Sequence, residues 1–217
     1  MVSSRLVCSF HHRDSSGLNA VNRVRDRIRN HVARLGFLMP SSLSKPRNYE
    51  SALVIPVPTA EDQIGELRRR FEPSGMFAHV TVLYPFVAAA LISSDVVEGL
   101  REVLSGFKPF AFELSEIGWF EDSVLFLAPT PRASFEELTA LVVERFPDYQ
   151  PYRGAFDEII PHLTIGESGR PTRLRRAALQ LSRQIPITAL ASEVCLMVPD
   201  RSGHWQLYRS FPLGSRS

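Results

Sequence analysis

Two stretches of the sequence, HVTVLYPF at residues 79–86 and PHLTIGE at residues 161–167, decide how the fold is read. Each places a histidine and a threonine two residues apart in an otherwise apolar segment rich in Val, Ile and Leu. Such segments are typical of strands. Because successive side chains of a strand point to opposite faces, the histidine and threonine of each stretch share one face. The sequence therefore predicts two strands that each present an imidazole and a hydroxyl together.

The elements around these two stretches follow one order twice. In each case a helix precedes the His-x-Thr strand, a second helix follows it, and further strands close the series. The predicted elements are a strand at 51–58, a helix at 59–71, the first motif strand, a helix at 93–105, a hairpin at 110–129, a helix at 132–146, the second motif strand at 162–167, a helix at 171–184, and strands at 185–200 and 204–213. We interpret the repeated order as an internal duplication of the architecture.

The helix at residues 59–71 carries signals at both ends. Thr59 is predicted to be its N-cap, and acidic residues follow in the first turn. Arg68, Arg69 and Arg70 occupy the last turn, where positive charge complements the helix dipole.

Composition and charge limit the size of the folded domain and the kind of partner that it can bind. A chain of 217 residues with 44% hydrophobic residues suits one large domain or two small packed lobes. Residues 1–48 hold nine Lys or Arg and two acids, whereas the remainder holds 16 Lys or Arg and 21 acids. The mild excess of acidic residues after residue 48 argues against an extended basic surface that binds nucleic acid along its length. Any nucleic-acid site on the folded domain is therefore expected to be local and small.

Residues 1–48 are predicted to be a basic N-terminal extension, and residues 49–217 the folded domain. Apolar residues recur at steps of three and four between Leu18 and Leu35, which predicts one amphipathic helix followed by a linker. Three interpretations remain open for the extension. It is a surface helix or a stretch upstream of the true domain, an organelle transit peptide, or a basic arm for nucleic acid or membrane.

The sequence carries no sign of a membrane span or of a secretory signal. Its two cysteines, Cys8 and Cys195, show neither metal-ligand spacing nor a disulfide framework. We therefore expect a reducing, cytoplasmic location, no membrane association and a monomeric chain.

Two histidines and two threonines that converge on one cleft would form a set suited to phosphodiester chemistry. One neutral imidazole can accept a proton while a protonated one donates a proton to the leaving oxygen. The threonine hydroxyls can donate hydrogen bonds to the non-bridging phosphate oxygens. This chemistry requires neither a metal nor a nucleotide cofactor, and the helical His and Glu spacing of zinc hydrolases does not occur in the sequence.

These motifs resemble those of the two-histidine phosphoesterases, and within them the 2′-5′ RNA ligase or cyclic phosphodiesterase group. The resemblance covers about residues 50–213 and is supported by the opening ALVIPVP and the closing HWQLYRSFPL segments. It implies a bilobal α+β fold with two pseudosymmetric halves, each bringing an antiparallel sheet, helices and one motif to a central active-site cleft. One departure is Ala78, where many relatives have a proline before the first histidine.

The resemblance also implies the activity and its residues. It points to a metal-independent hydrolase of 2′,3′-cyclic phosphates or 2′-5′ linkages at RNA ends or in small nucleotides, with a possible reverse ligase reaction. The residues that match the family's four catalytic positions are His79, Thr81, His162 and Thr164. Which histidine is the acid is left open, with the hypothesis that His79 lies nearer the leaving group.

Aromatic and basic residues near the motifs are candidates for substrate contact. Base stacking needs an aromatic platform, for which the candidates are Tyr84, Trp119, Phe120, Tyr152 and Phe156. Tyr152 and Phe156 are preferred because they lie in the loop that leads into the second motif.

Arg153 is a candidate phosphate contact. Gly166 either lets a substrate approach closely or marks the end of its strand.

Two alternatives to an enzyme stay open: a non-catalytic RNA- or nucleotide-binding module with the same cleft, and an interaction protein that docks through its basic extension.

Overall fold

The computed structural model describes residues 49–71, 76–156, 158–168 and 170–215. The predicted extension and its helix lie outside these residues. The described elements are β1 (Ala52–Pro56), α2 (Pro58–Arg69), β2 (His79–Leu83), η1 (Ala89–Leu91), α3 (Ser94–Gly106), β3 (Phe110–Phe120), β4 (Val124–Thr130), α4 (Ala133–Arg145), η2 (Pro151–Gly154), β5 (Leu163–Glu167), α5 (Pro171–Leu181), β6 (Ile187–Ala191), β7 (Glu193–Pro199) and β8 (Trp205–Pro212).

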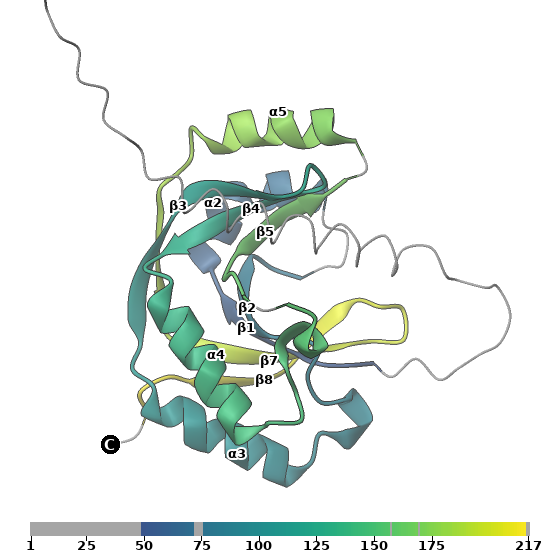
Figure 1. Ribbon diagram of the computed structural model, residues 1–217, viewed down its shortest axis with the longest axis vertical. Coiled ribbons are helices and arrows are strands. Elements are labelled where there is room, and N and C mark those ends of the chain that lie inside the picture. Colours follow the sequence, from purple (N-terminus) through teal and green to yellow (C-terminus); the bar gives the residue numbers. More distant parts are fainter. Residues whose placement is uncertain (1–48, 72–75, 157, 169, 216–217) are drawn as a thin grey trace, which may run out of the picture. The chain divides into compact units, whose positions relative to one another are not determined.

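The described strands form two four-stranded sheets (Figure 1), one in the order β2-β1-β7-β8 and the other in the order β5-β4-β3-β6. Every neighbouring pair is antiparallel. The two motif strands, β2 and β5, occupy equivalent edge positions in the two sheets. The predicted α+β fold with two halves, each holding one motif in an antiparallel sheet, is confirmed.

The halves of the fold are not contiguous halves of the sequence. The hairpin β3–β4 follows the first motif in the chain, yet it joins the sheet of the second motif. The units that repeat are β1–α2–β2 and β4–α4–β5, in each of which a helix connects an inner strand to an antiparallel motif strand. The duplicated order predicted from the sequence therefore holds, but β3 and β4, which follow the first motif, join the sheet of the second motif. Of the strands that follow the second motif, β6 stays in its sheet, whereas β7 and β8 join the sheet of the first motif.

The single strand predicted at residues 185–200 is wrong, because this segment forms two strands in different sheets. β6 pairs with β3, whereas β7 pairs with β1 and β8. Ser192 alone separates β6 from β7, and its carbonyl accepts a hydrogen bond from the amide of Leu213 at 2.9 Å. The apolar pattern continues through this point because both strands are core strands, so the hydropathy of the segment does not mark the change of sheet.

Both motif strands carry the same irregularity in register. Thr81 lies opposite Val54 of β1, and Thr164 lies opposite Phe126 of β4. Immediately after each threonine the motif strand has one extra residue relative to its partner, as in a β-bulge. Bulges bend a strand and re-aim its side chains, so the two motifs share their local geometry as well as their sequence.

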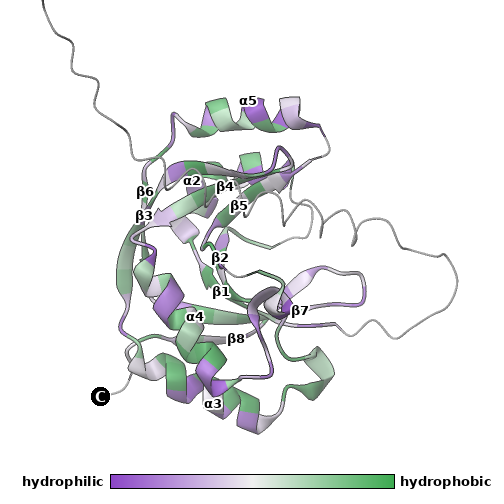
Figure 2. Ribbon diagram, viewed as in Figure 1, coloured by the Kyte–Doolittle hydropathy of each residue, from purple (hydrophilic) through white to green (hydrophobic). Residues whose placement is uncertain are grey.

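The helices cover the two sheets separately. α2 packs against β5 and β6, and α5 packs against β4, whereas α4 packs against β2 and α3 against β8 and α4. Figure 2 shows apolar and polar residues alternating around α4 and α5, as expected for helices with one face on a core.

The predicted N-cap at Thr59 is wrong, because α2 begins at Pro58, with Val57 in the N-cap position. Proline favours the first helical position, where its fixed φ suits the helix and its missing N–H would have no partner. The Thr59 hydroxyl instead donates to the carbonyl of Thr188 in β6, at 3.1 Å, and so ties the start of α2 to its sheet.

Candidate active site

The two motif histidines make the same backbone hydrogen bond. Nδ1 of His79 lies 2.7 Å from the carbonyl oxygen of Phe77, and Nδ1 of His162 lies 2.7 Å from that of Ile160. Because a carbonyl only accepts, the hydrogen is assigned to Nδ1 in both rings. Nε2 is then the ring nitrogen that can exchange a proton with a bound molecule. The two imidazoles are therefore fixed in one tautomer and in matching orientations.

Residues of both motifs border one pocket of about 220 Å³. It brings His79 and Thr81 of the first motif together with Thr164 of the second, so three of the four motif side chains predicted to converge border this pocket. The lining residues are Ala52, Val54, Arg68, Met76, His79, Thr81, Tyr84, Tyr152, Thr164 and Trp205.

Some of the apolar residues that line this pocket belong to a small hydrophobic cluster that is separate from the main core. Its buried members are Ala52, Val54, Met76, Cys195 and Met197, and Phe77 and Trp205 pack against them. Burial raises the pKa of the Cys195 thiol to about 11, with the nearby Glu193 carboxylate as a second cause. Cys195 is therefore a protonated, buried thiol at neutral pH, as its apolar sequence context predicts.

His162 is partly buried, as His79 is, and it is not among the residues that line the pocket. Its ring centroid lies 4.8 Å from that of Phe120, edge to face, and 5.2 Å from that of Phe126. Burial lowers the pKa of His162 below its usual value of 6.5, and the hydrogen bond to Ile160 only partly opposes this effect. The imidazole of His162 is therefore neutral at neutral pH, which suits a proton acceptor.

Two of the four predicted substrate-contacting residues, Tyr84 and Tyr152, line the pocket. The amide of Tyr152 donates to the carbonyl of Tyr84 at 2.8 Å, which ties the two segments together. Burial raises the pKa of both phenols, and for Tyr84 the Glu50 carboxylate adds to the effect. Both hydroxyls therefore remain protonated, as possible hydrogen-bond donors, at neutral pH.

The other two predicted contacts, Phe156 and Arg153, are not among the lining residues. Phe156 packs edge to face against Tyr152, with ring centroids 5.4 Å apart, so it contacts a residue that lines the pocket without lining the pocket itself. Arg153 is 71% exposed, and its guanidinium pairs with the Glu50 carboxylate at 2.6 Å.

The turn that carries Tyr152 has an unusual backbone. Tyr152, Arg153 and Gly154 have φ values of 49°, 58° and 70°. Left-handed conformations of non-glycine residues cost of order 1–3 kcal/mol each and cluster at functional sites. The backbone is therefore strained at the residue that presents its ring to the pocket.

Arg68, Met76 and Trp205 line the pocket without having been predicted from the sequence. One feature of the sequence could have identified Arg68 as a candidate site residue. It continues the buried stripe of α2 formed by Ala60, Ile64 and Leu67, where a charged residue is unexpected. The ring of Trp205 meets that of Tyr84 edge to face at 6.0 Å.

Gly166 provides for close packing rather than for the approach of a substrate. A Cβ at this position would collide with Cβ of Phe71, which lies just beyond the end of α2, and would lie 2.8 Å from its Cγ. The glycine therefore lets the end of α2 pack directly on the second motif strand.

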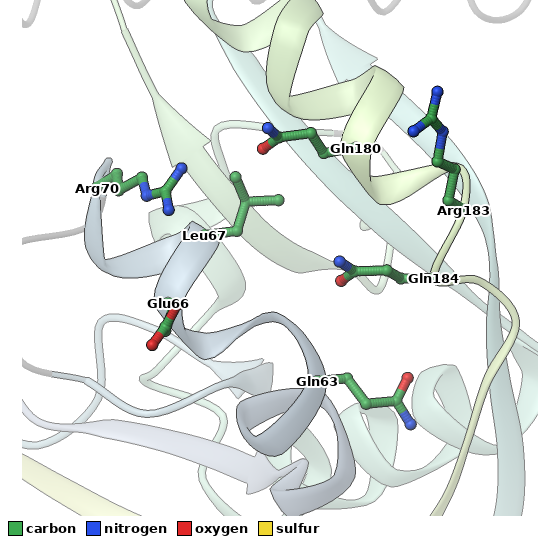
Figure 3. A pocket seen from close by; sticks show the side chains of 7 residues that line it. All are labelled: Gln63, Glu66, Leu67, Arg70, Gln180, Arg183 and Gln184. Carbon is green, nitrogen blue, oxygen red and sulfur yellow. The ribbon is translucent and has the colours of Figure 1, made fainter.

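A larger pocket of about 340 Å³ lies between α2 and α5 and is separate from the motifs (Figure 3). Its lining residues are Gln63, Glu66, Leu67, Arg70, Gln180, Arg183 and Gln184. It contains no histidine or threonine of either motif, so the smaller pocket is the candidate active site.

The described part of the chain contains neither a cluster of metal-ligating side chains nor a helix that could span a membrane. Residues 49–71, 76–156, 158–168 and 170–215 contain no group of three or more His, Cys, Asp or Glu side chains placed to hold a metal ion. In the same ranges no helix has the length and apolar character needed to cross a membrane.

Comparison with known proteins gives concordant matches. A model of the 2′-5′ RNA ligase superfamily matches residues 56–203. A protein of Halalkalibacterium halodurans named "Putative phosphoesterase BH1439" is 27% identical over 173 residues, which cover 77% of this chain and 98% of that protein. "Putative phosphoesterase OB1230" of Oceanobacillus iheyensis is 28% identical over 119 residues, covering 52% of this chain and 67% of the relative.

Among solved structures, TT0787 of Thermus thermophilus superimposes with a TM-score of 0.54 at 12% identity, covering 77% of this chain and all of that one. At this identity the match supports the fold alone.

Proposed function

The chain belongs to the 2′-5′ RNA ligase superfamily, and on this premise we propose that it is a metal-independent phosphoesterase. Its proposed substrates are 2′,3′-cyclic phosphates or 2′-5′ phosphodiester bonds at RNA ends or in small nucleotides. The observation that carries the proposal is the matched geometry of the two histidines. Each holds its Nδ1 on the carbonyl two residues earlier in the chain, which leaves Nε2 for proton transfer.

The two histidines divide the proton transfers of cyclic-phosphate hydrolysis. His162 accepts a proton from the attacking water as the water oxygen bonds to phosphorus. The bond from phosphorus to one ribose oxygen breaks, and protonated His79 gives that oxygen a proton, which yields a phosphomonoester and a ribose hydroxyl. The assignment is supported by the lowered pKa of His162, which keeps it neutral, and by the position of His79 on the pocket.

The two threonines stabilise the charge on the phosphate. Thr81 and Thr164 border the same pocket from different sheets, and their hydroxyls donate to the non-bridging oxygens as negative charge accumulates there. In the reverse, ligase direction the histidines exchange roles, because the same proton transfers run backwards.

The aromatic residues on the pocket provide a surface for a base. Tyr84, Tyr152 and Trp205 border it together, and stacking on aromatic rings is how single nucleotides are commonly held. The cytoplasmic location and the monomeric state expected from the sequence stay predictions.

The activity is tested with a panel of three substrates in the presence of EDTA. The panel comprises a 2′,3′-cyclic mononucleotide, an RNA oligomer with a 2′,3′-cyclic end, and a 2′-5′-linked dinucleotide. Turnover of at least one of them is expected, whereas no turnover of any by the folded protein would contradict the proposal.

The division of roles is tested with a cyclic or diester substrate whose leaving group needs no protonation. The His79→Ala variant should regain activity on this substrate relative to the natural one, because its missing acid is no longer required. The His162→Ala variant should not. Equal recovery in both variants would refute the assignment.

A further inference from the structure

The helices that cover the two sheets differ in charge. Residues 170–184, which include α5, contain five arginines and no acidic residue. α3 and α4, which pack on the sheet of the first motif, each contain three acidic residues and one arginine. Because the folded domain carries an excess of acidic residues, α5 is a local basic surface within a mildly acidic molecule.

One row of side chains on α5 runs beside α2. Arg173, Arg176 and Gln180 follow one another at steps of three and four, which places them on the same side of the helix. The guanidinium of Arg173 lies over the ring of Phe71, 5.3 Å from its centroid, just beyond the end of α2. At a rise of about 1.5 Å per residue, the row spans roughly 10 Å from Arg173 to Gln180.

The larger pocket, between α2 and α5, continues this row with further hydrogen-bond donors. Arg70 at the end of α2 and Arg183 just after α5 both line it (Figure 3), and Glu66 is the one acid among the described residues that do so. Guanidinium and carboxamide groups are side chains that commonly contact the phosphates and sugars of nucleic acids. The carboxamides at this pocket are those of Gln63, Gln180 and Gln184.

Carboxylates do not neutralise the arginines of this surface. Arg70, Arg176 and Arg183 are exposed, and none of them forms an ion pair within the part of the chain that the structure describes. By contrast, the guanidinium of Arg101 on α3 pairs with a carboxylate one turn away. A group of like charges without counter-charges creates a positive potential that attracts anions.

This surface lies next to the second motif strand. Phe71, under the guanidinium of Arg173, packs so closely on Gly166 that a Cβ there would collide with it. Gly166 follows Thr164, which borders the candidate active site, by two residues in β5. The basic row on α5 therefore begins near the strand that presents the second motif.

We propose that Arg70, Arg173, Arg176, Gln180 and Arg183, together called the α2–α5 face, bind the phosphate backbone of an RNA strand whose end occupies the candidate active site. A row of cations that spans roughly 10 Å and continues into a pocket matches successive phosphates better than the single charged end of a mononucleotide. The inference rests on the proposed function and selects RNA ends, rather than free mononucleotides, as its substrates.

The test is RNA binding by the full-length protein, measured by fluorescence anisotropy at several salt concentrations. The probe is a labelled 2′-O-methyl RNA oligomer that ends in a 3′-phosphate, which the proposed reaction leaves unchanged. The test variant replaces Arg70, Arg176 and Arg183 by Gln. Its slope of log K against log salt should be smaller by about 2, and its binding weaker by roughly 100-fold at about 0.1 M salt, because each phosphate contact on a single strand contributes about 0.7 to the slope.

The matched control removes the same charge from the opposite part of the domain. It replaces Arg101 of α3, Arg145 of α4 and Arg209 of β8 by Gln, all of which are exposed. This variant should bind the probe as the wild type does. If the test variant does not fold, Arg176→Gln alone decides, with an expected decrease of about 0.7 in the slope.

Wild-type binding in the test variant, or an equal loss in the control, would overturn the inference. If the test variant instead lost binding to vesicles of anionic phospholipid while it kept RNA binding, the face would belong to a membrane contact. In turnover, the test variant should lower kcat/KM for an RNA oligomer with a 2′,3′-cyclic end and leave that for the cyclic mononucleotide unchanged, whereas an equal loss on both would also overturn it.

The binding measurement separates this inference from the proposed function. Binding of the unreactive probe needs no turnover. A protein that binds this RNA through the α2–α5 face and yet hydrolyses none of the proposed substrates would refute the proposed function and leave the RNA-binding surface established.

Discussion

Replacing Gly166 with alanine tests the packing that joins α2 to the second motif strand. The new Cβ would collide with Cβ of Phe71 and lie 2.8 Å from its Cγ. Carbon atoms in contact prefer separations of about 3.5–4.0 Å, so even the Cγ would have to withdraw by at least about 0.7 Å. The Cβ of Phe71 is fixed to the backbone, and no rotamer can relieve the collision. Either β5 or the end of α2 must move.

The expected cost follows from overpacking of a buried contact. Such substitutions destabilise by typically about 1–3 kcal/mol. For a domain of this size, each kcal/mol lowers the Tm by about 2–4 °C, which predicts a decrease of about 2–12 °C. A displaced end of α2 would also stretch the hydrogen bond from Arg68 to the carbonyl of Thr164, so turnover should fall with stability.

The assay is urea unfolding followed by circular dichroism, with the free energy of unfolding taken from the midpoint and slope. A Phe71→Gly change removes the colliding Cβ and should recover most of the loss in a double-mutant cycle, whereas Phe71→Ala keeps that Cβ and should not. Wild-type stability of the Gly166→Ala protein would refute the packing argument, as would equal recovery by both Phe71 changes.

Three further predictions concern the site. Thr81→Val and Thr164→Val should each lower kcat by about 10²- to 10³-fold, while the serine variants retain most of it; steady-state kinetics that show no loss would exclude a role in charge stabilisation. Phe120→Leu should let water reach His162 and raise the pKa of its imidazole towards 6.5. Because the base acts when neutral, the acidic limb of the kcat/KM profile against pH should then move to higher pH. An acidic limb that does not move would contradict the assignment of His162 as the base. Arg153→Ala should leave KM unchanged and alter stability by at most about 1 kcal/mol, since its ion pair is exposed; a raised KM would restore Arg153 as a substrate contact.

Much of the local structure can be predicted from the sequence because its causes are local. The two motif strands follow from β-branched apolar runs, and α3 follows from Ser93, whose hydroxyl accepts the amide hydrogen of Val96 at the helix start. The pairing of β3–β4 with the second motif strand, and the change of sheet at Ser192, depend on partners distant in the chain. Neither leaves a mark in the hydropathy pattern of the segment itself.

The candidate site likewise combines features with local causes and features that depend on residues distant in the chain. Alternation along a strand places His79 with Thr81 on one face, which needs no knowledge of the fold. Arg68 joins the pocket only because the end of α2 packs across the edge strand β5, and Trp205 only because β8 lies in the sheet of the first motif. The lowered pKa of His162 likewise depends on Phe120 and Phe126, which come from the neighbouring hairpin.

The most direct test of the account is the turnover of a 2′,3′-cyclic mononucleotide in excess EDTA by the wild type and by the His79→Ala and His162→Ala variants. The account predicts that wild-type turnover survives EDTA and collapses in both folded variants, because each histidine carries one of the two proton transfers. Turnover abolished by EDTA, or retained in either variant, would contradict a metal-independent mechanism based on two histidines.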